Sequence, residues 1–160
     1  MPEHAGSSSS KKDLHVTDTA IDSPQTIPQR CVIIVDAALP VGKAANAAAV
    51  IALTIGQRHP ELVGPALVDA DGCAHPGLIP IGIAVLAASR DELAGIRAKG
   101  VESGCDVVDF PVQGQETTNY QAFCDAVANM ATSDLGYLGV ALIGEKKPIS
   151  RIVANIGLLK

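Results

Sequence analysis

Residues 30–57 read RCVIIVDAALPVGKAANAAAVIALTIGQ, and this stretch decides the fold class. Its first seven residues, Arg30–Asp36, are a continuous apolar run rich in β-branched side chains, which is typical of a strand covered on both faces. After a short connection, residues 41–57 are nearly all apolar and rich in alanine, and their length favours a helix. Because so few of its side chains are polar, we expect this helix to be buried on most sides.

The same alternation of strand and helix continues to the end of the chain. Three further apolar runs predict strands at 81–87, 105–110 and 138–144. Residues 61–77 are predicted to form a loop, because their DADG and HPG segments are turn signals. A strand followed repeatedly by a helix predicts an α/β sheet with helices on both faces.

Capping signals mark where the later helices begin. Ser89 opens an S-x-x-E capping box, and the helix behind it is predicted to end at Gly104. Thr118 opens a T-x-x-Q box before an amphipathic segment at 120–131, which predicts a helix that packs by one face. A turn at 145–148 precedes a short closing helix predicted at 149–156.

Length and composition favour one globular domain behind a leader. The chain has 160 residues, and single domains typically run to about 100 to 200 residues. Residues 1–27 contain a four-serine run and lack apolar periodicity, so they are predicted to be a flexible leader. Hydrophobic residues are 48% of the chain and charged residues 18%, which excludes disorder for the bulk. We expect a single domain at 28–160.

Charge and cysteine usage restrict the partners and the compartment. The net charge of -5 argues against a protein that coats nucleic acid by bulk attraction. The cysteines lie far apart in the chain and form no C-x-x-C pair, so we expect buried thiols in a reducing compartment. The longest uncharged apolar stretch, 44–56, is too short to cross a bilayer. We therefore expect a cytoplasmic protein that does not enter membranes.

Candidate site residues follow the ends of the predicted strands. In open α/β sheets ligands bind beyond the carboxyl ends of the strands, where Asp36, Lys43 and Asn46 lie. Lys43 and Asn46 are three residues apart and share one face of the predicted helix. Asp109 ends another strand and, if that strand is parallel to the first, faces the Lys43 region. The alternatives are that Lys43 extends to solvent, Asn46 caps or bridges a loop, and Asp109 is a solvated loop carboxylate.

Several familiar ligand motifs are missing from this sequence. A Walker A loop would need glycine at Ala37 and Ser or Thr at Ala44, and no G-x-G-x-x-G follows the first strand. A calcium loop beginning at Asp69 would need glutamate at Pro80. The histidines have no ligand partners at zinc spacing. We therefore expect neither a metal nor a cofactor.

Three segments carry a resemblance to a known family. RCVIIVDAALPVGKAANAAAV, VVDF and YLGVALIGEKKPISRIVANIGLLK resemble a bacterial family of unknown function that shares the peptidyl-tRNA hydrolase fold of the archaeal and eukaryotic type. The resemblance implies a three-layer α/β/α domain with a mixed four-stranded sheet, of the peptidyl-tRNA hydrolase type 2 kind, and a homodimer. It places Lys43 and Asp109 at the catalytic positions, and it implies substrate contacts for Asn46, Thr117 and Thr118.

Two classes of function stay open at this stage. As a divergent hydrolase, the protein would cleave an ester or amide, with Lys43 binding an oxygen and Asp109 steering water. The substrate would then be a small molecule or linked to tRNA, with Lys146, Lys147 and Arg151 as basic contacts. As a non-catalytic module, it would bind a small ligand or a peptide end at the same place. Turnover, as opposed to saturable binding alone, separates the two classes.

Overall fold

The computed structural model describes residues 27–160. The predicted leader, apart from Ile27, lies outside the described residues. In chain order the elements, with η for a 3-10 helix, are β1 (Arg30–Asp36), α1 (Val41–Arg58), η1 (Pro60–Leu62), β2 (Leu67–Val68), β3 (Ala74–His75), β4 (Ile83–Ala88), α2 (Arg90–Glu102), β5 (Asp106–Pro111), η2 (Val112–Gln115), α3 (Tyr120–Ala128), η3 (Thr132–Asp134), β6 (Tyr137–Gly144) and α4 (Lys146–Ile152).

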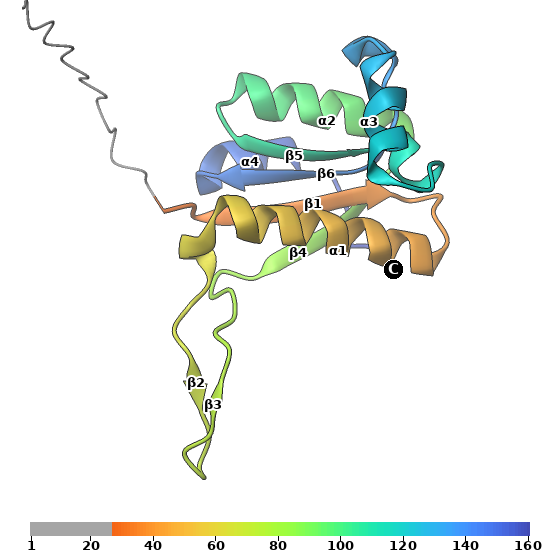
Figure 1. Ribbon diagram of the computed structural model, residues 1–160. Helices are drawn as coiled ribbons and strands as arrows, with labels where there is room; N and C mark the ends of the chain where they lie inside the picture. The colour runs from red at the N-terminus through yellow and green to blue at the C-terminus, as the bar shows by residue number, and fades with distance from the viewer. Residues whose placement is uncertain (1–26) are drawn as a thin grey trace, which may run out of the picture.

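Four strands form one mixed sheet in the order β4-β1-β6-β5 (Figure 1). β1 is parallel to β4 and antiparallel to β6, and β5 is antiparallel to β6. β1, β4 and β5 therefore run in one direction, and their carboxyl ends meet at one edge of the sheet. The mixed four-stranded sheet that the family resemblance implies is confirmed.

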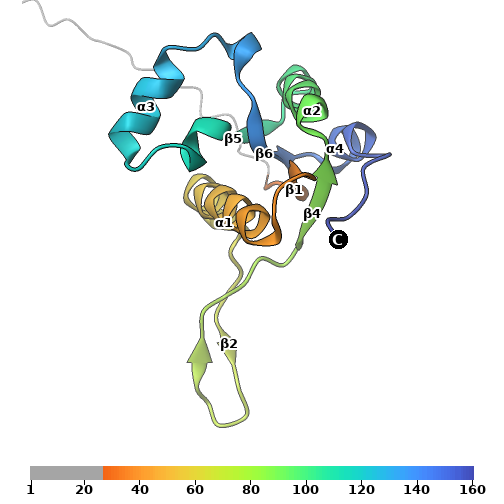
Figure 2. The same cartoon turned by 90° about the vertical axis from the view of Figure 1, so that its right-hand side faces the viewer.

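Helices cover both faces of the sheet, so its central strands are buried on each side (Figure 2). Side chains alternate along β1: Ile33 and Val35 pack in the cluster that contains α1, whereas Val32 and Ile34 pack in the cluster that contains α2 and α4. The continuous apolar run of β1 reflects this burial on two faces. The predicted arrangement of helix layer, sheet and helix layer is present.

The long helix α1 is less buried than its composition suggests. Its inner face carries Ala44, Ala47, Ile51 and Ile55, all buried at helical spacing against the sheet. Its outer side is open to solvent, and Leu53 is 79% exposed. The expectation that α1 is buried on most sides is wrong, because only one face of the sheet lies beside it.

The helix starts agree with one capping prediction and correct another. Ser89 and Glu92 form the predicted capping box at the start of α2. Thr118 does not cap α3: Asn119 does, accepting a hydrogen bond from the backbone N–H of Ala122 at 2.9 Å. The cap of α3 therefore lies one residue later than the T-x-x-Q pattern implies, at a residue whose side-chain oxygen also suits an N-cap.

The closing helix begins earlier than predicted, inside the segment 145–148 expected to be a turn. α4 starts at Lys146, and Pro148 lies in its first turn. Proline is tolerated there because the first backbone N–H groups of a helix have no partner within the helix. The segment 145–148, which was predicted to be a turn, therefore contains the start of α4.

The segment predicted as a loop at 61–77 contains a small hairpin. β2 and β3 pair antiparallel over two residue pairs, and Gly72 turns the chain with a φ of 82°. We call residues 63–81 the arm, because they project away from the body of the domain (Figures 1 and 2). The sequence predicted the turn but not the projection.

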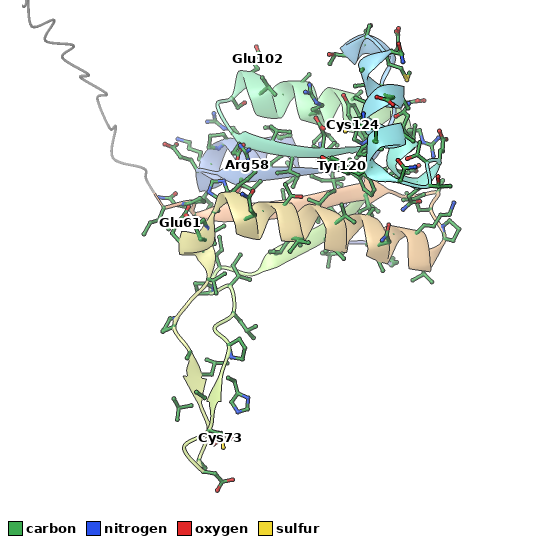
Figure 3. All side chains as sticks on the ribbon, in the orientation of Figure 1. Arg58, Glu61, Cys73, Glu102, Tyr120 and Cys124 are labelled. Atoms are coloured by element: carbon green, nitrogen blue, oxygen red, sulfur yellow. The ribbon has the colours of Figure 1, made fainter. Side chains whose placement is uncertain are left out.

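The cysteines do not share one environment. Cys31 is buried and Cys105 is half-buried, but Cys73 and Cys124 are exposed, on the arm and on α3 respectively (Figure 3). All four are free thiols. The expectation of buried thiols is therefore wrong for Cys73 and Cys124.

Candidate functional site

Asp36, at the carboxyl end of β1, is held in an ion pair. Its side chain is 2% exposed and accepts hydrogen bonds from Arg90 Nε at 3.0 Å and from the backbone N–H of Ala38 at 3.0 Å. Arg90 Nη2 lies 2.9 Å from Asp36 Oδ2, the oxygen that Arg90 Nε also contacts, and the arginine side chain is 53% exposed. A buried carboxylate needs such partners. Asp36 therefore ties β1 to the start of α2.

Lys43 and Asn46 lie on the exposed side of the first turns of α1, and Gln115 of η2 joins them. Gln115 Nε2 donates to the backbone oxygen of Lys43 and to Asn46 Oδ1, each at 3.2 Å. Residues 69 or more positions apart in the chain are thus brought together. The Lys43 ammonium makes no ion pair with any carboxylate among residues 27–160.

Two amide oxygens of η2 lack a donor. Gln113 Oε1 and Gln115 Oε1 are buried and accept no hydrogen bond from the part of the chain that the structure describes. Gln113 Nε2 donates to Met130 Sδ at 2.8 Å. Buried acceptors are rarely left without a partner, so each such oxygen calls for an explanation. Gly114 between them is required by space: an added Cβ would lie 2.0 Å from Phe110 Cε2.

Thr117 and Thr118 follow η2 and differ in their contacts. Thr117 Oγ1 donates to the backbone oxygen of Gln113 at 2.8 Å, which fixes the loop to η2. Both threonines line a surface pocket of about 230 Å³, together with Tyr120 and Phe123 of α3. The two aromatic rings meet edge to face with centroids 6.0 Å apart. The loop after η2 supplies the polar side of this pocket, and the first turn of α3 supplies the aromatic side.

Asp109 lies on the other side of the sheet. Its neighbours Val108 and Phe110 pack in the cluster of α1, so the alternation of β5 turns Asp109 toward α2. There its carboxylate accepts a hydrogen bond from Arg97 Nε. The expectation that Asp109 faces the Lys43 region is therefore not met, although β5 is parallel to β1 as that expectation required.

Arg97 has two partners on that face. In addition to Asp109, its guanidinium lies 5.8 Å from the centroid of the Tyr137 ring. The hydrogen bond from Arg97 to Asp109 raises the pKa of the arginine further, and burial raises the pKa of the Tyr137 hydroxyl. These contacts make Asp109 part of the packing between α2 and the sheet.

A second polar cluster lies at the opposite edge of the sheet. His59 Nε2 lies 2.8 Å from Asp106 Oδ2 and His59 Nδ1 lies 2.9 Å from Glu61 Oε1, while Arg58 Nη2 lies 2.6 Å from Asp106 Oδ1. Arg58, and after it His59, lower the pKa of Asp106 against the opposing effect of burial. Figure 3 labels Arg58 and Glu61 at this end of α1. His59 and Asp106 also line a pocket of about 380 Å³ with Cys105.

Sequence patterns missed several of these residues. Gln113 and Gln115 were not singled out, although two glutamines around a glycine directly after a strand were a usable signal. Arg90 lies 54 residues from its partner Asp36, and Arg97 lies 12 residues from its partner Asp109. No sequence pattern indicated either pairing. Within residues 27–160, no group of three or more His, Cys, Asp or Glu could hold a metal ion. No helix in that range is long and apolar enough to cross a bilayer.

The fold defines a mixed α/β protein with a four-stranded sheet and helices on both faces. Residues 29–160 match the family described as Protein of unknown function (DUF2000), and the chain belongs to that family. A family of unknown function was expected from the sequence, and this is confirmed. The peptidyl-tRNA hydrolase fold stays a prediction.

Among solved structures, the chain is similar to the protein of unknown function Atu0240 from Agrobacterium tumefaciens strain C58. The two are 19% identical with a TM-score of 0.74, over 81% of this chain and 96% of that chain. At this identity the similarity shows the fold alone. A comparison with curated proteins gives no match.

Proposed function

We propose that the protein binds a small ligand or the carboxyl end of a peptide, without cleaving it, where α1 meets η2. We call Lys43, Asn46, Gln115 and Thr117 the α1–η2 site. The proposal rests on the hydrogen bonds that Gln115 Nε2 donates to the Lys43 backbone oxygen and to Asn46 Oδ1. The other amide atom of Gln115, Oε1, accepts no hydrogen bond from residues 27–160. Gln115 contacts the backbone of Lys43, and the ammonium of that exposed lysine would bind a carboxylate of the ligand.

The neighbouring pocket limits the size of the ligand. Its volume of about 230 Å³ is smaller than the roughly 300 to 1,000 Å³ of sites for drug-sized molecules. Its Tyr120 and Phe123 rings offer an apolar surface, and its Thr117 and Thr118 hydroxyls offer polar contacts. A single side chain next to a terminal carboxylate matches this combination.

Hydrolysis of an ester or amide is the second candidate, and it rests on the resemblance of LPVGKAANAAA and VVDF to the family with the hydrolase-type fold. A hydrolase needs a group that orients or deprotonates water within hydrogen-bond reach of the substrate. Asp109, the carboxylate expected in that role, is bound to Arg97 on the face opposite α1. This placement is why we favour binding over turnover.

Binding is tested with N-acetyl-phenylalanine, titrated into isotope-labelled protein and followed by NMR. We expect saturable shifts in the Gln115 side-chain amide and the Thr117 backbone amide. Lys43→Ala removes a charged hydrogen bond, so the affinity should fall by about 10-fold or more. Lys99→Ala, which removes an exposed lysine of α2, is the matched control and should bind normally. Equal affinity for wild type and Lys43→Ala would reject the site.

Turnover is tested with a peptidyl-tRNA substrate in the same variants. We expect no release of free tRNA at high protein concentration. Release by the wild type that is lost in Lys43→Ala would replace the binding proposal with the hydrolase. Release that falls as salt rises would further indicate contacts to the tRNA phosphates.

A further inference from the structure

A further pocket lies where β1 and β4 begin. Its volume is about 440 Å³, within the roughly 300 to 1,000 Å³ of small-molecule sites. Residues 29–32 and 81–84 line it together with Lys146, the first residue of α4, and α4 packs beside the start of β1 (Figure 1). The α1–η2 site lies beyond the other end of β1, and the seven residues of this strand span about 20 Å. The two sites are therefore separate, and we call this one the β1–β4 pocket.

Arg30, the first residue of β1, brings a positive charge to this pocket. Its side chain is half-buried and lies on the sheet face of α4, where Arg30 Nη1 donates to Ser150 Oγ at 2.5 Å. Within residues 27–160 the guanidinium forms no ion pair with a carboxylate. A guanidinium has five N–H donors, so one bond to a hydroxyl leaves most of them unused. A half-buried charge is stabilised by an opposite charge, and Arg30 therefore favours an anion in the pocket.

Ser150 of α4 fixes the position of Arg30 without neutralising it. Ser150 Oγ donates its proton to the backbone oxygen of Lys146 at 2.6 Å, so toward Arg30 the hydroxyl only accepts. The guanidinium is thereby held beside the start of α4, and its charge stays uncompensated by Ser150. Ser150 is therefore a positioning residue for Arg30.

Lys146 and Gln29 add further donors to the β1–β4 pocket. Lys146 is exposed and forms no ion pair within the part of the chain that the structure describes. Gln29 Oε1 accepts a hydrogen bond from the backbone N–H of Lys146 at 3.4 Å, which leaves Gln29 Nε2 as a donor. Among residues 27–160 no aspartate or glutamate lines this pocket, and Glu145, next to Lys146 in the chain, lines a different one. The pocket thus combines two positive charges with several N–H donors.

We propose that the β1–β4 pocket binds the phosphate group of a small phosphomonoester. Such a phosphate carries a charge of about -1.5 to -2 at pH 7, and its three terminal oxygens accept hydrogen bonds from Arg30, Lys146 and Gln29. The planar fork of arginine suits two of these oxygens at once. Ile81 and Ile83 also line the pocket and offer an apolar surface to the group that the ester carries. The proposal does not depend on what the α1–η2 site binds.

Calorimetric titration of the full chain with phenyl phosphate at low salt tests this site. We expect a dissociation constant below about 1 mM, and Lys146→Gln should raise it about 10-fold or more because a charged hydrogen bond is lost. Lys147→Gln removes the same charge from the adjacent exposed residue, which does not line the pocket, and is the matched control. It should change the constant by less than about 2-fold, since a charge in solvent is screened. Equal losses in the two variants, or no binding by the wild type at about 10 mM, would overturn the proposal.

The place and the class of the ligand are tested in isotope-labelled protein by NMR. Phenyl phosphate should shift the Gln29 side-chain amide and the Gly82 backbone amide, and the Gln115 side-chain amide should stay in place. Benzoate carries a carboxylate on the same ring and should bind about 10-fold more weakly, because it has two oxygens and a single charge. Ser150→Ala keeps both positive charges but releases the guanidinium, so this preference for phenyl phosphate should fall. Shifts confined to Gln115, or equal affinity of the wild type for benzoate, would reject a phosphate site in this pocket.

Discussion

Arg97 of α2 donates a hydrogen bond to the Asp109 carboxylate on the face of the sheet that is turned away from α1. Lys43 lies on α1, so the four-stranded sheet separates the two residues that the family resemblance placed at catalytic positions. A carboxylate that is held by arginine in the packing of α2 is suited to a structural role. The role of Asp109 can therefore be tested separately from that of Lys43.

Replacing Asp109 should affect stability more than ligand binding. Asp109→Asn leaves Arg97 without its charged partner, and both side chains are more than two-thirds buried. The free energy of unfolding, measured in urea, should fall by about 1 to 3 kcal/mol. The affinity for N-acetyl-phenylalanine should stay at the wild-type value. A loss of affinity as large as that of Lys43→Ala, with unchanged stability, would instead place Asp109 in contact with the ligand.

Asp106 should make the fold sensitive to acid. Arg58 lowers the pKa of Asp106 in the folded state, so its ionised form contributes stability above the unfolded pKa of about 3.9. That contribution is lost as the pH falls through the lower folded pKa. Asp106→Asn should be less stable than wild type at pH 7, with the difference shrinking below about pH 4. Asp91→Asn, at an exposed position of α2, serves as the control in the same urea series. A difference that persists unchanged at pH 3 would refute this origin.

The four cysteines should react with a maleimide at different rates. Burial raises the pKa of Cys31 to about 11, so little thiolate is present at neutral pH and the sulfur is shielded from solvent. Burial also raises the pKa of Cys105. A maleimide followed by mass spectrometry should label Cys73 and Cys124 quickly, Cys105 more slowly and Cys31 only after denaturation. Labelling of Cys31 at the rate of Cys73 in native protein would contradict its burial.

Asn119, rather than Thr118, should stabilise the start of α3. Asn119→Ala removes the side-chain oxygen that accepts the Ala122 N–H, which should cost about 1 kcal/mol in urea unfolding. Thr118→Ala changes the adjacent exposed residue and should cost a few tenths of a kcal/mol at most. If Thr118→Ala lowers the free energy of unfolding more than Asn119→Ala does, Thr118 and not Asn119 caps α3.

Local patterns were sufficient for the class of fold and for the four strands of the main sheet, but not for the cap of α3, the start of α4 or the β2–β3 hairpin. The β-branched run of β1 and the alanine-rich length of α1 predicted a strand and a helix within one residue of their observed ends. The Ser89 capping box predicted where α2 begins. These signals are short-range, because backbone preferences and caps involve residues at most a few positions apart.

The candidate site could be predicted only in part. Lys43 and Asn46 were identifiable because a polar pair stands out in an apolar helix. Gln115, which joins them, lies 69 or more positions away, and only folding brings it there. The alternation of β5 decided that Asp109 faces Arg97, since one residue of register turns a side chain to the other face of a sheet.

The sequence alone therefore determined the order of strands and helices, the central buried strand and the residues able to carry chemistry, because these depend on local composition and period. The tertiary structure decided which of those residues meet. It placed Asp36 with Arg90 and Asp109 with Arg97, left the outer side of α1 open and extended the arm beyond the body of the domain. Strand order and long-range packing set these relationships, and no local pattern encodes them.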